Sequence, residues 1–304
     1  MKIIFAGSPK FAVPAFLSLA EKYGVAAVLT QPDKPLGRKQ VLTPTPVKAA
    51  AIEKGVPVYS FDKVGNHIDE IKALGCDLMI TCAYGQILPK ALLDIFPLGV
   101  WNLHASLLPK FRGASPVESA ILAGESHTGI TVMKTEVELD SGDMLLVKRC
   151  EVGDKTCGEL KEELSRLAAE AAIETISYIQ AGEPLLLMQD EAKVSFCKKI
   201  KKEDAKINFS GIAPQICRII KAYSPEPAAF CHLNGQVLNV FNAQVGGDEE
   251  GAVGEVIKAD KRGIVVKCGQ GSLILTSLQL AGGKRMSAAD FVNGRKIKAG
   301  DILD

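Results

Sequence analysis

The chain has 304 residues, of which 47% are hydrophobic and 23% charged, and its formal net charge is +1. This length and composition predict two domains, or one large one, with ample apolar material for a buried core. No apolar run is long enough to span a membrane, and the short apolar N-terminus predicts a first strand and not a signal peptide.

Strand-like and helix-like segments alternate through the first two thirds of the chain. The expected strands are residues 1–6, 24–30, 57–59, 77–83, 100–104, 128–133 and 144–152. The expected helices are residues 11–20, 47–54, 67–74, 117–123 and 155–180. This alternation predicts an α/β fold, a Rossmann-like and mainly parallel sheet with helices on both faces. Sites in such sheets lie beyond the carboxyl ends of the strands, but no GxGxxG motif supports a dinucleotide site.

Residues 31–46 interrupt this alternation with a long loop. The loop contains five Pro or Gly residues and carries Lys34, Arg38 and Lys39. A loop this long inside a domain is often functional, and the alternative is a mobile surface turn. The charge density alone does not distinguish a functional loop from a surface turn.

Two polar side chains interrupt the short apolar strand at residues 100–104. Asn102 and His104 are two residues apart, so both side chains point to the same face of the strand. Polar groups at a strand end need partners or a function. Asn supplies an amide donor and acceptor, and His supplies a ring nitrogen that can carry charge near neutral pH.

Asp140 lies in a second turn-forming stretch, and it could return to orient the imidazole. An Asn–His pair with a distant Asp suits acyl transfer to an amine that the substrate brings. Asn102 and charged His104 could stabilise the oxyanion, while Asp140 favours the charged imidazole and relays protons. The alternative is a hydrogen-bonded core histidine and an aspartate that only makes a turn.

The C-terminal third has a different pattern. Residues 189–206 are polar and lysine-rich, which is typical of a linker, and residues 213–221 predict a helix. Five short strand-like segments with Gly turns follow and predict a small β-barrel, OB-like in architecture. Residues 191–304 hold 17 Lys/Arg against 12 Asp/Glu, and this basic excess would suit a polyanionic partner.

The eight cysteines are scattered without a C-x-x-C pair, and the chain has four histidines. Most of these cysteines lie in apolar segments, which predicts thiols in the core and a reducing cytoplasm. The same spacing argues against a zinc site, and no metal is expected.

Together these motifs resemble the formyltransferase family that uses 10-formyltetrahydrofolate. The matching stretches are residues 102–109 (NLHASLLP), Gly113 and residues 139–143 (LDSGD). Residues 5–12 and 31–38, with the added C-terminal part, are most similar to family members that act on methionyl-tRNA. The similarity runs over almost the whole chain, with departures at Lys10 and Glu226.

The resemblance implies formyl transfer from 10-formyltetrahydrofolate, a co-substrate, to the α-amine of initiator methionyl-tRNA, for translation initiation. It implies a catalytic set of Asn102, His104 and Asp140, and tRNA contacts from Arg38 and Lys39. The implied folate-binding residues are Ser106, Leu107, Leu108, Pro109, Tyr84, Gly85, Gln86, Ile87 and Leu88. The expected domains are residues 1–188 (catalytic), 189–205 (basic linker) and 206–304 (tRNA-contacting barrel). We expect no membrane association and no obligate protein partner.

Two alternatives stay open at this point. Relatives with the same catalytic residues use glycinamide ribonucleotide or an amino sugar as acceptor, although the loop at 31–46 and the basic C-terminal part disfavour them. A catalytically silent RNA-binding module is a third reading, against which the intact Asn102, His104 and Asp140 argue.

Overall fold

A computed structural model describes residues 1–37, 40–182 and 185–304. The chain divides into two units, each with its own core. Unit 1 comprises Met1–Pro116, His127–Glu151 and Lys161–Cys197, and unit 2 comprises Val117–Ser126, Val152–Leu160 and Lys198–Asp304. The predicted domain limits at residues 188 and 205 stay predictions.

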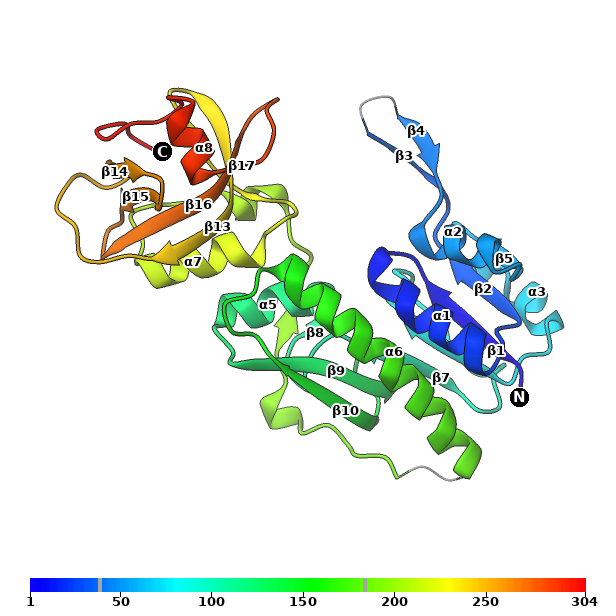
Figure 1. Cartoon of the computed structure of the whole chain (residues 1–304). Coiled ribbons are helices and arrows are strands. Elements are labelled where there is room, and N and C mark those ends of the chain that lie inside the picture. The colour runs from blue at the N-terminus through cyan, green and yellow to red at the C-terminus, as the bar shows by residue number, and fades with distance from the viewer. Residues whose placement is uncertain (38–39, 183–184) are drawn as a thin grey trace. The chain divides into compact units, whose positions relative to one another are not determined.

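Unit 1 contains a seven-stranded sheet in the order β10-β9-β7-β6-β1-β2-β5 (Figure 1). Neighbouring strands from β7 to β5 pair in parallel, whereas β9 pairs antiparallel with both β7 and β10. The predicted mainly parallel sheet is therefore confirmed. The strand bounds are β1 Ile3–Gly7, β2 Ala27–Thr30, β5 Val58–Ser60, β6 Leu78–Cys82, β7 Val100–His104, β9 His127–Lys134 and β10 Met144–Glu151.

The alternating residues of β1 show how the sheet is covered on both faces. Ile4 packs into an apolar cluster with Leu92 and Phe96, from α4 (Lys90–Leu93) and the segment that follows it. Phe5 points the other way and meets Phe16 of α1 (Val13–Lys22), with ring centroids 5.7 Å apart. Successive strand side chains alternate faces, so a run of apolar residues such as IIFAG is buried from both sides. The predicted helices on both faces are confirmed.

Five helices of the first two thirds of the chain, α1, α2, α3, α5 and α6, follow the predicted segments closely, whereas α4 was not predicted. Their bounds are α1 Val13–Lys22, α2 Pro46–Glu53, α3 Ile68–Ala73, α4 Lys90–Leu93, α5 Pro116–Ala123 and α6 Cys157–Ala181, with short 3-10 turns η1 Lys10–Ala12 and η2 Val64–Asn66. The long helix α6 runs beside α1 (Figure 1). The Tyr23 hydroxyl, directly after α1, lies 3.0 Å from the Ser177 hydroxyl of α6. No helix within the described residues is long and apolar enough to cross a membrane.

The start of α6 carries a capping box. The Glu159 carboxylate accepts hydrogen bonds from the Thr156 backbone N–H (2.8 Å) and hydroxyl (2.7 Å). The Thr156 hydroxyl in turn accepts from the Glu159 N–H at 3.4 Å. These reciprocal bonds satisfy donors that the first turn of a helix leaves unpaired. The hydrogen bonds from Thr156 hold the pKa of Glu159 below its ordinary value.

We expect Thr156→Ala to lower the free energy of unfolding by about 0.5–2 kcal/mol at neutral pH, because the cap is lost.

A carboxylate with a lowered folded-state pKa stabilises the protein above its ordinary pKa, and this contribution fades as the pH falls through the lowered value. The stability difference between wild type and Glu159→Gln should therefore shrink between neutral pH and about pH 3. Denaturant unfolding of wild type and Glu159→Gln at both pH values measures this difference in the free energy of unfolding. Glu162→Gln, which removes a carboxylate at an exposed position on the same helix, is the control.

The segment at residues 31–46 is not a plain loop. It contains a two-stranded antiparallel ribbon of β3 (Lys34–Leu36) and β4 (Val41–Thr43). Leu36, Val41 and Leu42 are 58–66% exposed on this ribbon, which is unusual for apolar side chains. The prediction of an unstructured loop is therefore wrong for this ribbon. The sequence did not reveal it, because the alternation of apolar and polar residues in such short strands is hidden among the Pro and Gly residues.

The lysine-rich stretch after residue 188 has ordered structure of its own. It contains the 3-10 turns η3 (Glu191–Lys193) and η4 (Lys202–Ala205) and the short strand β11 (Phe196–Cys197). β11 pairs in parallel with β8 (Arg112–Gly113), and both strands belong to unit 1. This pairing joins the segment after residue 188 to the loop that follows β7.

Unit 2 is built on an antiparallel sheet in the order β12-β13-β16-β15-β14, with β17 paired to β16. Residues 300–304 link the two edge strands: Leu303 bridges to Leu233 of β12, and the Val256 N–H of β14 donates to the Asp301 carbonyl. The chain end thus closes the sheet, and the predicted C-terminal barrel is confirmed. The element bounds are α7 Ala213–Ala222, β12 Ala229–Leu233, β13 Gln236–Val245, β14 Val256–Asp260, β15 Gly263–Lys267, β16 Ser272–Leu280, β17 Met286–Ser287 and α8 Ala288–Asn293.

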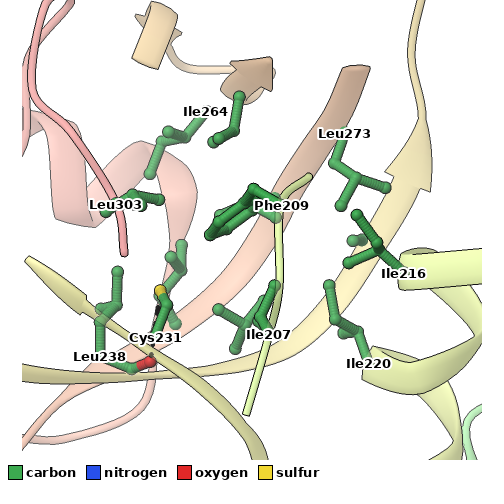
Figure 2. Packing of buried hydrophobic residues seen from close by; sticks show 14 of the residues in the cluster. Ile207, Phe209, Ile216, Ile220, Cys231, Leu238, Ile264, Leu273 and Leu303 are labelled. Atoms are coloured by element: carbon green, nitrogen blue, oxygen red, sulfur yellow. Dashed lines mark hydrogen bonds between the residues drawn. The ribbon is translucent and has the colours of Figure 1, made fainter. Parts of the chain in front are cut away.

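The core of unit 2 lies inside this barrel. Ile216 and Ile220, one turn apart on α7, point into the same apolar cluster as Phe209 and Leu273 (Figure 2). Residues four apart share one face of a helix, so α7 buries its apolar stripe against the strands and leaves its polar side outward. Leu303 joins the cluster, so the last residues of the chain are held by both backbone pairing and burial.

Candidate active site

β7 places Asn102 and His104 at the carboxyl edge of the parallel sheet. In the register with β6, Thr81 lies opposite Asn102, and its hydroxyl donates to the Asn102 Oδ1 at 2.8 Å. Because the oxygen of the amide is taken by Thr81, the Nδ2 group faces the other way, toward Asp140. The contact between Asn102 Nδ2 and Asp140 Oδ1 is 3.5 Å long.

His104 is 5% exposed, and both of its ring nitrogens face protein groups. Nε2 lies 3.0 Å from the Phe111 carbonyl oxygen, which can only accept, so Nε2 carries a hydrogen in this arrangement. Nδ1 lies 3.5 Å from Asp140 Oδ2. A charged N–H···O⁻ bond is normally about 2.7–2.9 Å long, so the Nδ1 side has room to share its hydrogen with a substrate atom.

Asp140 comes from the turn between β9 and β10, and its backbone has φ 50°, in the left-handed region. Its Oδ2 accepts a 2.8 Å hydrogen bond from the Gly113 N–H, in the loop after β7. The same carboxylate therefore faces Gly113, Asn102 and His104. The structure brings together the three residues that the sequence predicts, although 38 positions separate Asn102 from Asp140 in the chain.

This arrangement suits stabilisation of negative charge on an acyl oxygen. The Asn102 amide and the His104 ring supply N–H groups at one place, and the carboxylate of Asp140 lies directly behind them. Cys82, at the end of β6, does not supply a nucleophile, because burial raises the pKa of its thiol to about 12. An amine brought by the substrate meets the need instead.

The loop at Ser106–Pro109 follows β7 directly and is fixed from within unit 1. The Ser106 hydroxyl donates to the Lys110 carbonyl at 2.6 Å, and the Thr131 hydroxyl donates to the Ser106 carbonyl at 2.7 Å. The Leu108 N–H donates to the same Thr131 oxygen. Ser106 and Leu108 are buried, whereas Leu107 and Pro109 are half-buried, so part of this loop can contact a ligand.

The second predicted folate segment, Tyr84–Leu88, follows β6, the parallel neighbour of β7. Gln86 ties it down: Oε1 accepts from the Val64 N–H, and Nε2 donates to the Phe61 carbonyl. Gly85 and Ile87 are exposed, and Ile87 is 89% exposed. Because β6 and β7 are parallel neighbours, the two predicted folate segments leave the same edge of the sheet.

Tyr84, the first residue of this segment, is buried. Burial raises the pKa of its phenol to about 12, so the hydroxyl stays neutral at ordinary pH. Its carbonyl accepts hydrogen bonds from the Ser8 hydroxyl (3.1 Å) and Gln31 Nε2 (3.3 Å). These bonds connect the loop after β6 to the ends of β1 and β2.

Some groups in the site escape the sequence-based prediction. Thr81 orients Asn102, the Phe111 carbonyl orients His104, and the Gly113 N–H holds Asp140. Gln189 also reaches the Asp140 turn from beyond α6. Backbone groups have no signature in a sequence, and a glutamine in a polar stretch does not stand out. The predicted tRNA contacts Arg38 and Lys39 lie outside the described residues.

Within the residues that the structure describes, no cluster of three or more His, Cys, Asp or Glu side chains could hold a metal ion.

Comparison with known proteins identifies the family. Residues 1–176 match the formyl transferase family model, and residues 199–296 match the model of the formyl transferase C-terminal domain. The methionyl-tRNA formyltransferase of Citrifermentans bemidjiense is 43% identical over 307 aligned positions, which cover 100% of this chain and 96% of the relative. The enzyme of the same name from Ectopseudomonas mendocina is 42% identical, covering 97% of this chain and 95% of the relative.

A solved structure shows the same fold at low identity. HypX from Aquifex aeolicus in complex with tetrahydrofolic acid superposes with a TM-score of 0.66 at 16% sequence identity, over 96% of this chain. The match covers 47% of HypX, so the chain spans about half the length of that protein. The resemblance seen in the sequence is confirmed by the full-length relatives. The chain therefore belongs to the formyl transferase family, as a full-length relative of the methionyl-tRNA formyltransferases.

Proposed function

We propose that this protein transfers the formyl group of 10-formyltetrahydrofolate to the α-amine of initiator methionyl-tRNA, giving N-formylmethionyl-tRNA for translation initiation. We assign the catalytic step to Asn102, His104 and Asp140. The observation that carries this assignment is the meeting of these three side chains at the carboxyl edge of the sheet. Full-length relatives of about 40% identity that bear the methionyl-tRNA formyltransferase name support the acceptor.

In the proposed reaction the formyl donor supplies an activated amide, and the α-amine attacks its carbon. The formyl oxygen becomes negative as the new C–N bond forms. Asn102 Nδ2 is turned toward the site by Thr81, and His104 Nδ1 carries the second N–H when the ring is charged. Preorganised donors of this kind stabilise the transition state more than the ground state.

Asp140 has two tasks in this proposal. Its carboxylate stabilises the charged form of His104, which lies 3.5 Å away. Once the new C–N bond has formed, the amine nitrogen carries a positive charge, and Asp140 accepts through water the proton that it loses. This proton passes to the folate nitrogen as the old C–N bond breaks. The amine thus loses one proton and the folate nitrogen gains one, so no oxidant or metal is required.

Binding of the two substrates is assigned to separate segments. Ser106, Leu107, Leu108 and Pro109, with residues 84–88, would hold the folate at the edge where both segments emerge. Arg38 and Lys39 would contact the tRNA, and the basic residues 189–304 would add affinity for its phosphates. A cytoplasmic location accords with all eight cysteines being thiols.

The test is a transfer assay with labelled 10-formyltetrahydrofolate and three acceptors: methionyl-tRNA, glycinamide ribonucleotide and an amino sugar nucleotide. We expect label on methionyl-tRNA alone. Preferential transfer to either small acceptor would refute methionyl-tRNA as the acceptor but would still support formyl transfer to an amine. Binding of tRNA without any transfer would show that the protein is an RNA-binding module without catalytic activity.

A further inference from the structure

A glutamine far from the catalytic motifs holds the turn that carries Asp140. Gln189 Nε2 donates to the Asp140 carbonyl and to the Gly142 carbonyl, both at 2.8 Å. Both hydrogens of its amide are thus bonded to carbonyl groups of one turn, and Gln189 as a whole residue is 9% exposed. The contact spans 49 positions of the chain, so it is made only when the segment after α6 packs against the turn between β9 and β10, within unit 1.

The turn needs such support. Asp140 adopts φ 50°, a left-handed conformation that aspartate tolerates better than most residues but that still costs free energy. At Gly142 the backbone passes so close to Lys134 that a Cβ atom would lie 1.8 Å from the Lys134 carbonyl oxygen. The position of the Asp140 carboxylate therefore depends on a backbone that neighbouring groups must hold in place.

Arg112 decides which way the Gln189 amide points. Its Nε and Nη2 donate to Gln189 Oε1 at 3.0 and 2.9 Å, and its side chain is 5% exposed. A guanidinium has donors only, so the amide oxygen must face Arg112 and the NH₂ group must face the turn. Arg112 also precedes Gly113, whose N–H donates to the Asp140 carboxylate. Gln189 thus holds the main chain of Asp140, and the Gly113 N–H, directly after Arg112, holds its side chain.

We propose that Gln189, oriented by Arg112, is a positioning residue for formyl transfer, which keeps the Asp140 carboxylate against His104 and Asn102. Gln189 contacts the main chain of the turn, and its effect on the reaction passes through Asp140. Misplacement of a catalytic group by about 1 Å can lower a rate roughly 100-fold. This inference rests on the proposed role of Asp140.

Two variants test the amide donors separately from folding. Gln189→Glu keeps an oxygen partner for the buried Arg112 but replaces the NH₂ group by an acceptor, and Gln189→Met removes both functions. We expect each to lower kcat about 10- to 100-fold, while KM for the folate donor and for methionyl-tRNA stays within about twofold. Gln189→Glu should stay folded because Arg112 remains paired. Wild-type kcat in folded Gln189→Glu would overturn the proposal.

The control concerns the outer partner of Arg112. Glu191 accepts from Arg112 Nη2 at 2.7 Å, but its side chain is 73% exposed. An exposed ion pair contributes little, so Glu191→Gln should keep kcat within about twofold of wild type. A loss in Glu191→Gln as large as in Gln189→Glu would show that any disturbance of Arg112 slows the enzyme, and it would contradict a specific role for the Gln189 amide.

A double-mutant cycle separates positioning from a general structural role. If Gln189 acts through Asp140, Gln189→Glu should cost nothing further, within about twofold, when Asp140 is already Asn. Equal losses of kcat in the wild-type and Asp140→Asn backgrounds would overturn the proposal. The Asp140→Asn enzyme also isolates the underlying assignment: if it retains wild-type kcat, the catalytic role of Asp140 fails, whereas a slow Asp140→Asn beside a fast Gln189→Glu refutes only the positioning role.

Discussion

Asp140→Asn is expected to lower kcat by about 100- to 10,000-fold, the range of a general acid–base group, with little change in folate binding. Asparagine keeps an oxygen that can accept from the Gly113 N–H, as Oδ2 does now at 2.8 Å, so the turn should stay in place. It removes the negative charge that lies 3.5 Å from His104 Nδ1, and with it the support for a charged imidazole and the proton acceptor. Steady-state formyl transfer and folate binding by titration measure the two effects separately.

The control is Asp94→Asn, which removes an exposed carboxylate that pairs with Lys90 at 2.8 Å in the same unit. This variant should match wild type in both measurements, because exposed ion pairs contribute little. The assignment of Asp140 fails if Asp140→Asn keeps a kcat within a few fold of wild type. It also fails if the variant is unfolded by circular dichroism and thermal melting, because Asp140 would then serve the fold.

His104→Ala is expected to lower kcat by about 100- to 1,000-fold, as loss of one oxyanion donor does in other enzymes. The ring is held by the Phe111 carbonyl on one side and Asp140 on the other, so its Nδ1–H is aimed in advance at a shared point with Asn102. Since the interaction forms fully only with the negative oxygen, KM should change less than kcat.

Single-turnover transfer with saturating folate isolates the chemical step in this variant. His232→Ala provides the matched control, because His232 lies in unit 2 and faces Asp304 at 3.8 Å. It should keep the wild-type rate of the chemical step. A His104→Ala enzyme within a few fold of wild type would remove His104 from the mechanism and leave Asn102 as the main oxyanion donor.

Several features of this protein were predictable from its sequence because they depend on neighbours along the chain. The alternation of apolar strands and amphipathic helices predicted the parallel sheet and the helices on both faces, and the period-2 spacing predicted that Asn102 and His104 share one face of β7. The C-terminal strands with Gly turns predicted the barrel. The residues by themselves suggested Asp140 only as a group that could orient the imidazole. The family resemblance placed it in the catalytic set and added the folate segments.

Other features depend on contacts that no local pattern records. The antiparallel ribbon β3–β4 within residues 31–46 was missed, as was the closing of the barrel by residues 300–304. In the site, the Phe111 carbonyl and the Gly113 N–H are main-chain groups that every residue carries, so residue identity gives no sign of their use.

Gln189 illustrates the same limit. The sequence placed it in a polar stretch, but its two bonds to the Asp140 turn form only after segments 49 positions apart pack together. Periodicity and turn chemistry arise from the geometry of a few consecutive residues, so they determined the strands, the helices and the face on which Asn102 and His104 lie. Tertiary packing decided the orientation of the Asn102 amide, the partners of the imidazole and the support of Asp140, because these depend on which distant segments become neighbours once the core is buried.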